Sequence, residues 1–149
     1  MDFEGVFFDI EDYELTETKL GSGTFGTVYL SKSLINNQMY ATKLINLDNV
    51  ENFTGKCQMQ FMRESLILHK LQHPAIVQFI GINFQSFNDP KIFQPTIITE
   101  YVPQGSLKSV LNLEKASLSK RGWNATKRYI SLLGISNAMR YMHKHGLIH

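Results

Sequence analysis

Three glycines at positions 21, 23 and 26 constrain this chain more than any other feature, because of the residues that follow them. The pattern G-x-G-x-x-G is weak by itself, since it also opens helices that bind dinucleotides. Here the third glycine leads into Thr27-Val28-Tyr29-Leu30, a run that favours a strand. The loop is therefore predicted to join two strands, and its backbone N–H groups can approach phosphates without obstruction by Cβ atoms. A glycine-rich hairpin without a ligand is the alternative at this point.

Several stretches rich in β-branched and aromatic residues are predicted to be strands. The adjacent asparagines Asn36-Asn37 suit a tight hairpin turn, and Asn88-Asp89-Pro90 marks a turn in a longer loop. The predicted strands cover residues 13–20, 27–31, 39–45, 75–82 and 96–102.

A helix is predicted over residues 58–71, between the third and fourth strands. Phe61, Glu64 and Leu68 recur there at spacings of three and four, which is typical of a helix with one inward face. Pro74 ends this helix. The first two-thirds of the chain is therefore predicted to form a five-stranded antiparallel sheet with one helix.

The last third of the chain is predicted to be helical. Ser106 can cap a helix that runs to residue 113, and Asn124 or Thr126 can cap a longer one to about residue 145, where Gly146 provides a stop. Apolar residues occur on more than one side of the longer helix, as in a helix surrounded by protein. The predicted fold class is α+β, a sheet with one helix followed by further helices.

Composition excludes several classes of protein. The 149 residues are 43% hydrophobic and 19% charged, as in a folded domain. A net charge of +2, without basic clusters, predicts no nucleic-acid partner. The acidic amino terminus and the absence of a long apolar run predict neither a secretory signal nor a membrane span. With Cys57 as its one cysteine, the chain is predicted to be cytoplasmic.

Two charged residues are candidates for a buried pair. Ala41 and Lys43 alternate on one face of the third strand, so a small side chain leaves room for a flat base while the ammonium reaches phosphate oxygens. Glu64 lies on the apolar stripe of the helix, where a carboxylate needs a partner to offset its desolvation. Lys43 is the obvious partner.

In this order along the chain, the motifs resemble those of the protein kinases. GSGTFGTV is similar to the glycine-rich loop of the family, and the segments at residues 41–43, 63–64 and 73–77 are similar to its strand lysine, its helix glutamate and its H-P-x-I-V entry to the fourth strand. Residues 97–107 resemble the hinge between the lobes, and residues 141–149 resemble the run before the catalytic loop. The residues around these motifs, particularly HPAIVQFIGINF and ITEYVPQGSL, are most similar to those of the tyrosine-kinase-like serine/threonine group.

The resemblance implies ATP and Mg²⁺ as cofactors and a protein serine or threonine as phosphate acceptor. It implies catalytic positions for Lys43 and Glu64, a gatekeeper at Thr99, and adenine hydrogen bonds from the backbones of Glu100 and Val102. The implied ATP-binding residues are Leu20, Gly21, Ser22, Gly23, Thr24, Phe25, Gly26, Val28, Ala41, Lys43, Thr99, Glu100 and Val102. The strand reads Tyr40-Ala41-Thr42-Lys43 instead of V-A-I-K, and both substitutions fall on the face away from nucleotide.

The resemblance also divides the chain. It implies an acidic leader at residues 1–12, a small lobe at 13–102, and the hinge with the start of a large lobe at 103–149. His149 matches the first residue of the catalytic-loop motif, so the catalytic Asp and the metal-binding residues of the family do not occur within this sequence. The chain is therefore expected to be a truncated kinase domain that is inactive alone and has no metal site of its own.

Two other functions stay open at this stage. The chain can be a non-catalytic module that binds nucleotide or a partner, or a β-rich interaction domain whose glycine loop arose by chance, which the ordered series of motifs disfavours. Because large apolar side chains of the last helices would face water without the rest of a large lobe, self-association through these helices is also expected.

Overall fold

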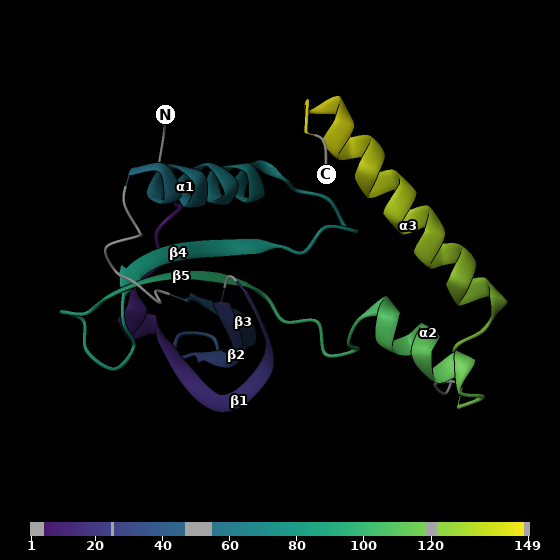
Figure 1. The fold of residues 1–149 in the computed structure, drawn as a ribbon, viewed down its shortest axis with the longest axis horizontal. Helices are drawn as coiled ribbons and strands as arrows, with labels where there is room; N and C mark the ends of the chain where they lie inside the picture. Colours follow the sequence, from purple (N-terminus) through teal and green to yellow (C-terminus); the bar gives the residue numbers. More distant parts are fainter. Residues whose placement is uncertain (1–4, 25, 47–54, 119–121, 148–149) are drawn as a thin grey trace. The chain divides into compact units, whose positions relative to one another are not determined.

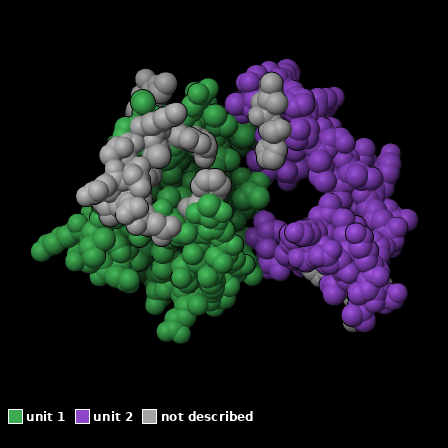
Figure 2. Space-filling model, viewed as in Figure 1, with its two compact units in different colours: residues 1–72, 77–101 green, residues 73–76, 102–149 purple. Residues whose placement is uncertain are grey.

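A computed structural model describes residues 5–24, 26–46, 55–118 and 122–147, except for the side chains of Lys56, Cys57, Gln60 and Glu64. The chain divides into two compact units, shown in green and purple in Figure 2. Unit 1 comprises residues 1–72 and 77–101, and unit 2 comprises residues 73–76 and 102–149.

Unit 1 is built on a sheet that has five antiparallel strands within the described part of the chain, in the order β1-β2-β3-β5-β4 (Figure 1). The predicted fold class is confirmed. The Asn36-Asn37 turn between β2 and β3 places Asn37 in the left-handed region, with φ of 60°. The strands are β1 (Tyr13–Gly23), β2 (Gly26–Ser33), β3 (Met39–Ile45), β4 (Phe79–Gln85) and β5 (Phe93–Glu100).

The fourth strand differs from its predicted bounds. Residues 75–78, expected to begin it, lie before the strand, and the first two belong to a turn in which the Ile76 N–H donates to the His73 carbonyl at 2.9 Å. The Ala75 N–H donates to Nδ1 of His73 at 3.1 Å. These local bonds satisfy backbone groups that a strand would pair, so the β-branched composition of the segment does not decide its structure. The last strand was expected at residues 96–102. It begins three residues earlier, at Phe93, and ends at Glu100.

Helix α1 (Gly55–Lys70) lies over the sheet beside β4 in Figure 1 and closes one core. Phe61 of the helix is buried with Phe79 and Ile82 of β4, and Leu68 packs against the same cluster. The inward face predicted from Phe61 and Leu68 is therefore confirmed. This cluster, which we call core A, consists of buried Val6, Phe61, Phe79 and Ile82 with the residues packed on them.

A second cluster, core B, consists of buried Phe8, Ile10 and Ile98 with the residues packed on them. Residues 1–12 were expected to be an acidic leader, yet Val6, Phe8 and Ile10 are among the buried apolar residues of unit 1. The alternation of apolar residues at positions 6, 8 and 10 was the available signal for this packing. The segment ends in the 3₁₀-helix η1 (Ile10–Asp12).

Unit 2 contains α2 (Leu107–Lys115) and α3 (Ala125–Lys144), both capped as predicted. The Ser106 hydroxyl accepts from the Ser109 N–H at 3.2 Å, and the Asn124 side chain accepts from the Lys127 N–H at 3.0 Å. Gly146 ends α3 with φ of 72°. Each cap satisfies a backbone group that the helix end leaves open, so the sequence fixes these boundaries locally.

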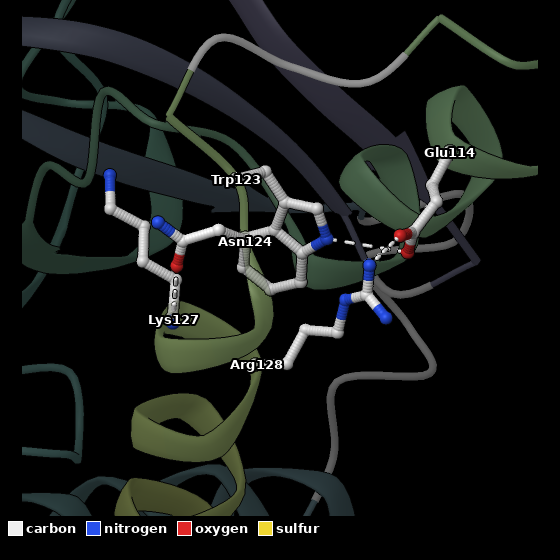
Figure 3. Close-up of polar contacts among 5 residues, drawn as sticks. All are labelled: Glu114, Trp123, Asn124, Lys127 and Arg128. Atoms are coloured by element: carbon white, nitrogen blue, oxygen red, sulfur yellow. Dashed lines mark hydrogen bonds and ion pairs between the residues drawn. The ribbon is translucent and has the colours of Figure 1, made fainter.

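Polar contacts join the two helices of unit 2 (Figure 3). Glu114 of α2 accepts from Nε1 of Trp123 at 3.3 Å and forms an ion pair with Arg128 of α3. The pair is partly exposed to solvent, so it is worth about 1 kcal/mol or less. Within the described residues, no helix is long and apolar enough to cross a membrane.

Candidate functional site

The glycine-rich segment forms the predicted hairpin between β1 and β2. Gly21 pairs with Val28, and Gly23 pairs with Gly26, so the strands are paired up to the turn. Thr24 lies in this turn, whereas Phe25 lies outside the described residues. Because two β-strands flank the loop, the dinucleotide-binding alternative, in which glycines open a helix, is wrong.

The three glycines have different surroundings. A Cβ atom at Gly26 would lie 2.3 Å from the backbone oxygen of Leu44, so β2 and β3 approach too closely there for any side chain. A Cβ atom at Gly21 or Gly23 would meet no described atom within 4 Å. The sheet itself therefore requires Gly26, whereas Gly21 and Gly23 present open backbone that a ligand can reach.

One face of the sheet gathers the predicted nucleotide residues of unit 1. Lys43 on β3 pairs with Val28 on β2, and Ala41 pairs with Thr99 on β5. Paired residues of antiparallel strands share a face, and so do residues two apart along a strand. Val28, Ala41, Lys43 and Thr99 therefore lie on a single face. We call it the lysine face.

Core A lies on the same side of the sheet. Ile97 pairs directly with Lys43, and both Ile97 and Ile45 pack against the cluster that includes Phe61 of α1. Helix α1 is thus seated on the lysine face. Lys43 itself is half-buried beside these apolar neighbours.

Tyr40 and Thr42 occupy the opposite face, as alternation along β3 predicts. Thr42 is fully buried, and its hydroxyl lies 2.6 Å from that of Ser31, so the two hydroxyls satisfy each other. Tyr40 packs against core B. The two departures from the V-A-I-K pattern therefore leave the lysine face unchanged.

Glu64 is placed by its backbone alone. It lies within α1, three residues after Phe61 and four before Leu68, and both of these side chains pack in core A. Residues at these spacings share one side of a helix. The side chain of Glu64 lies outside the described part, so its pairing with Lys43 stays a prediction.

The predicted hinge residues fall at the end of β5 and just after it. The Glu100 N–H donates to the Gln78 carbonyl at 2.9 Å, and its carboxylate accepts from the Gln78 N–H at 2.8 Å. The carbonyl of Glu100 accepts a long bond of 3.4 Å from the Thr99 hydroxyl. Gln78 was not expected to have a role, and no sequence pattern marks it.

The remaining predicted residues are exposed. Leu20, Gly21, Ser22, Gly23 and Thr24 are exposed residues at the end of β1 and in its turn. Val102 is exposed and belongs to unit 2, whereas Glu100 belongs to unit 1. Among the described residues, no group of three His, Cys, Asp or Glu side chains is arranged to hold a metal ion.

Comparison with known proteins agrees with this arrangement. The chain matches the family described as the protein kinase domain over residues 14–149. It is 30% identical, over 99% of its length, to the probable serine/threonine-protein kinase kinY of Dictyostelium discoideum. It is 32% identical over 91% of its length to the serine/threonine-protein kinase TNNI3K of Homo sapiens, and 34% identical over 88% to the serine/threonine/tyrosine-protein kinase HT1 of Arabidopsis thaliana. The chain spans 25%, 14% and 31% of these three proteins, respectively.

The chain belongs to the protein kinase domain family. Its antiparallel sheet with α1 corresponds to the small lobe of that fold, and the helices that follow correspond to part of the large lobe. The predicted resemblance to the tyrosine-kinase-like serine/threonine group is confirmed.

Proposed function

We propose that this protein binds ATP through the lysine face and the glycine hairpin of unit 1. The observation that carries the proposal is the strand register, which aligns Val28 with Lys43 and Ala41 with Thr99. A small apolar surface for a base and a cation for phosphate therefore occur on one face. Gly21 and Gly23, next to Val28 in the hairpin, supply open backbone on the β1 side.

Each residue has a distinct role in this proposal. The N–H groups of the glycine hairpin bind phosphate oxygens, and the Lys43 ammonium neutralises phosphate charge. Val28 and Ala41 pack on the adenine ring. Glu64 pairs with Lys43 and orients it.

Recognition of the adenine edge needs one acceptor and one donor from the backbone. The Glu100 N–H is already bonded to Gln78, so Glu100 contributes its carbonyl oxygen, which accepts from the exocyclic amine. The family resemblance assigns the donor to the backbone of Val102. Thr99, which precedes Glu100 on β5, limits the space in the site beyond the adenine ring.

As part of a protein kinase domain, the site would present the γ-phosphate of ATP to a protein serine or threonine. Mg²⁺ would shield the phosphate charge, but residues 1–149 contain neither the catalytic-loop Asp nor the metal-binding Asn and Asp of the family motifs. We therefore propose that these 149 residues alone bind nucleotide with little or no phosphoryl transfer, because alignment of acceptor and metal supplies most of the rate.

Calorimetry with ATP, with and without Mg²⁺, tests the proposal on three proteins: the wild type, Lys43→Ala and Lys32→Ala. Lys32 is the matched control because it is also half-buried on a central strand but pairs with Glu14 and Met39. We expect Lys43→Ala to weaken binding about tenfold or more and Lys32→Ala to leave it unchanged. Equal affinity in all three proteins, or no binding by folded wild type, would overturn the assignment.

Binding to a protein partner is a second candidate function, favoured by the apolar surface of unit 2. Among the large apolar residues that are exposed on α3, Ile130, Leu132 and Ile135 are 60%, 62% and 49% accessible. A second copy of the chain is the partner we expect. Light scattering over a concentration series should show association that Leu132→Lys with Ile135→Lys abolishes, whereas a wild-type monomer at all concentrations would count against this candidate.

A further inference from the structure

Residues 5–12, which we call the N-terminal strap, pair with the edge strand of the sheet. Phe7 forms a parallel bridge with Ile82 on β4. The Ile82 N–H donates to the Val6 carbonyl at 2.8 Å, and the Phe8 N–H donates to the Ile82 carbonyl at 3.1 Å. The Asn83 side chain donates to the Phe8 carbonyl at 2.8 Å. The strap is therefore held by specific backbone bonds and belongs to the folded unit.

The strap contributes to both cores of unit 1, through different residues. Val6, with 0% of its surface exposed, belongs to core A together with Phe61 of α1. Phe8 and Ile10 belong to core B, which contains no α1 residue among its described members. Val6 is thus the buried strap residue of core A, whereas the half-exposed Phe7 lies beside Phe84 of that core at a ring separation of 6.2 Å.

The strap packs closely against Gly81 on β4. A Cβ atom at this position would lie 3.1 Å from the Val6 carbonyl oxygen and 3.3 Å from the Phe8 side chain. Both distances are tighter than ordinary van der Waals contact, so a side chain at this position requires the strap to shift by a few tenths of an ångström. The glycine gives a second, independent reason to regard the docked strap as a built feature.

Helix α1 rests on the sheet mainly through β4, the strand that the strap borders. Its contacts include Phe61 with Phe84 at a ring separation of 5.6 Å and His69 with Phe79 at 5.8 Å. A displacement of β4 therefore changes the position of α1 on the sheet, because packed interiors transmit small displacements.

We propose that Val6 is a positioning residue for nucleotide binding: with the strap docked on β4, it holds α1 so that Glu64 stays in reach of Lys43. This inference rests on the proposed ATP site. It makes the strap and the nucleotide thermodynamically coupled, so each stabilises the bound state of the other.

The strap itself offers a matched pair of variants. Val6→Ala and Ile10→Ala each remove buried apolar atoms from the strap, and both should lower stability in urea unfolding. Val6→Ala should weaken ATP binding about fivefold by calorimetry, whereas Ile10→Ala should leave the affinity within about twofold of wild type. Gly81→Ala, whose Cβ atom would press on both the Val6 carbonyl oxygen and the Phe8 side chain, should shift the strap and also weaken ATP binding, and it replaces Val6→Ala if that variant does not fold.

Hydrogen exchange in the full chain separates this inference from the proposed site. Without nucleotide, the backbone amides of residues 61–65 should exchange faster in Val6→Ala than in Ile10→Ala. With ATP, the Phe8 and Ile82 amides of the wild type should exchange more slowly.

Equal effects of the two variants on ATP affinity and on α1 exchange would overturn the inference while leaving the ATP site intact. If the wild type does not bind ATP, the proposed site fails and the coupling to nucleotide fails with it. In that case, faster exchange of the α1 amides in Val6→Ala than in Ile10→Ala would still support the part of the inference that Val6 holds α1 on the sheet.

Discussion

The two units differ in how far they cover their own apolar residues. Unit 1 buries side chains on both sides of its sheet, against α1 in core A and against the strap in core B. In unit 2, α2 has no buried residue among those described, and α3 buries Ala138. A sheet that packs against both a helix and an edge strap supplies partners for its own apolar residues, whereas two helices alone do not.

This difference assigns separate roles to the units. Unit 1 holds every described residue that the family resemblance assigns to nucleotide, apart from Val102. Unit 2 exposes large apolar side chains on both of its helices, and a hollow on α2 is lined by Leu107 and Leu111 together with polar residues of the same helix. We therefore expect substitutions in unit 1 to act on stability and nucleotide, and substitutions in unit 2 to act on association.

The sharpest test of the contrast removes one large apolar side chain from each unit. Ile98→Ala in core B should lower the free energy of unfolding by about 2–5 kcal/mol, because Ile98 is fully buried. Leu132→Ala on α3 should change it by less than about 0.5 kcal/mol, because Leu132 is 62% exposed.

Urea titration followed by near-ultraviolet circular dichroism measures the first change. The fluorescence of Trp123, the one tryptophan in the sequence, reports the second from within unit 2. Similar losses for the two variants would contradict the difference in burial between the two units.

A glycine-to-alanine pair should give changes of opposite sign. Gly26→Ala should destabilise unit 1 by about 2–3 kcal/mol, since its Cβ atom would meet the Leu44 backbone oxygen at 2.3 Å. Gly134→Ala should stabilise α3 by up to about 1 kcal/mol, because alanine favours helix and its Cβ atom would meet Ala75 at an ordinary 3.7 Å. Thermal unfolding monitored by circular dichroism checks both signs, and a stable Gly26→Ala protein would contradict the close approach of β2 and β3.

The polar contacts of unit 2 should contribute less than either core of unit 1. Glu114→Ala removes the acceptor of both Trp123 and Arg128 and should cost about 0.5–1 kcal/mol, less in 1 M salt, where charges are screened. Lys115→Ala, at the exposed neighbouring position, is the control. Fluorescence-detected urea unfolding of these variants measures the cost, and a value above about 2 kcal/mol would show that unit 2 depends on these contacts more than its exposure indicates.

The smallest expected effect concerns pH and unit 1. Burial, with smaller effects of Tyr40 and Asp12, raises the pKa of Tyr13 above its ordinary value of 10.0. The unfolded chain then loses this proton first, so the stabilising contribution is complete below pH 10 and is lost as pH rises through the folded pKa.

Tyr13→Phe should reduce the loss of stability between pH 9.5 and about pH 11, measured as the urea midpoint. The control is Tyr129→Phe, because Tyr129 is 64% exposed. An identical alkaline loss in wild type and Tyr13→Phe would contradict the proposed effect of burial.

The sequence predicted those features that depend on neighbouring residues. Ser106, Asn124 and Gly146 were identified because caps and stops act within a few residues of the helix end. Alternation along β3 likewise placed Ala41 and Lys43 on one face.

Three features were missed, one because of local turn bonds and two because they depend on distant segments. The start of β4 was misjudged because turn bonds around His73 replaced strand pairing. The burial of Val6 was missed because it depends on backbone pairing with Ile82 of β4, far along the chain, which the acidic composition of the amino terminus does not indicate. The requirement for Gly26 depends on how closely Leu44 approaches, which no pattern near residue 26 reveals.

The central claim, that Lys43 meets the phosphates of bound ATP, is tested most directly by an acyl-phosphate derivative of ATP that acylates a lysine beside the phosphates. Peptide mass spectrometry after labelling should find the modification on Lys43, and an excess of unmodified ATP should prevent it. Labelling spread over exposed lysines such as Lys70 and Lys108, and unaffected by ATP, would contradict the account.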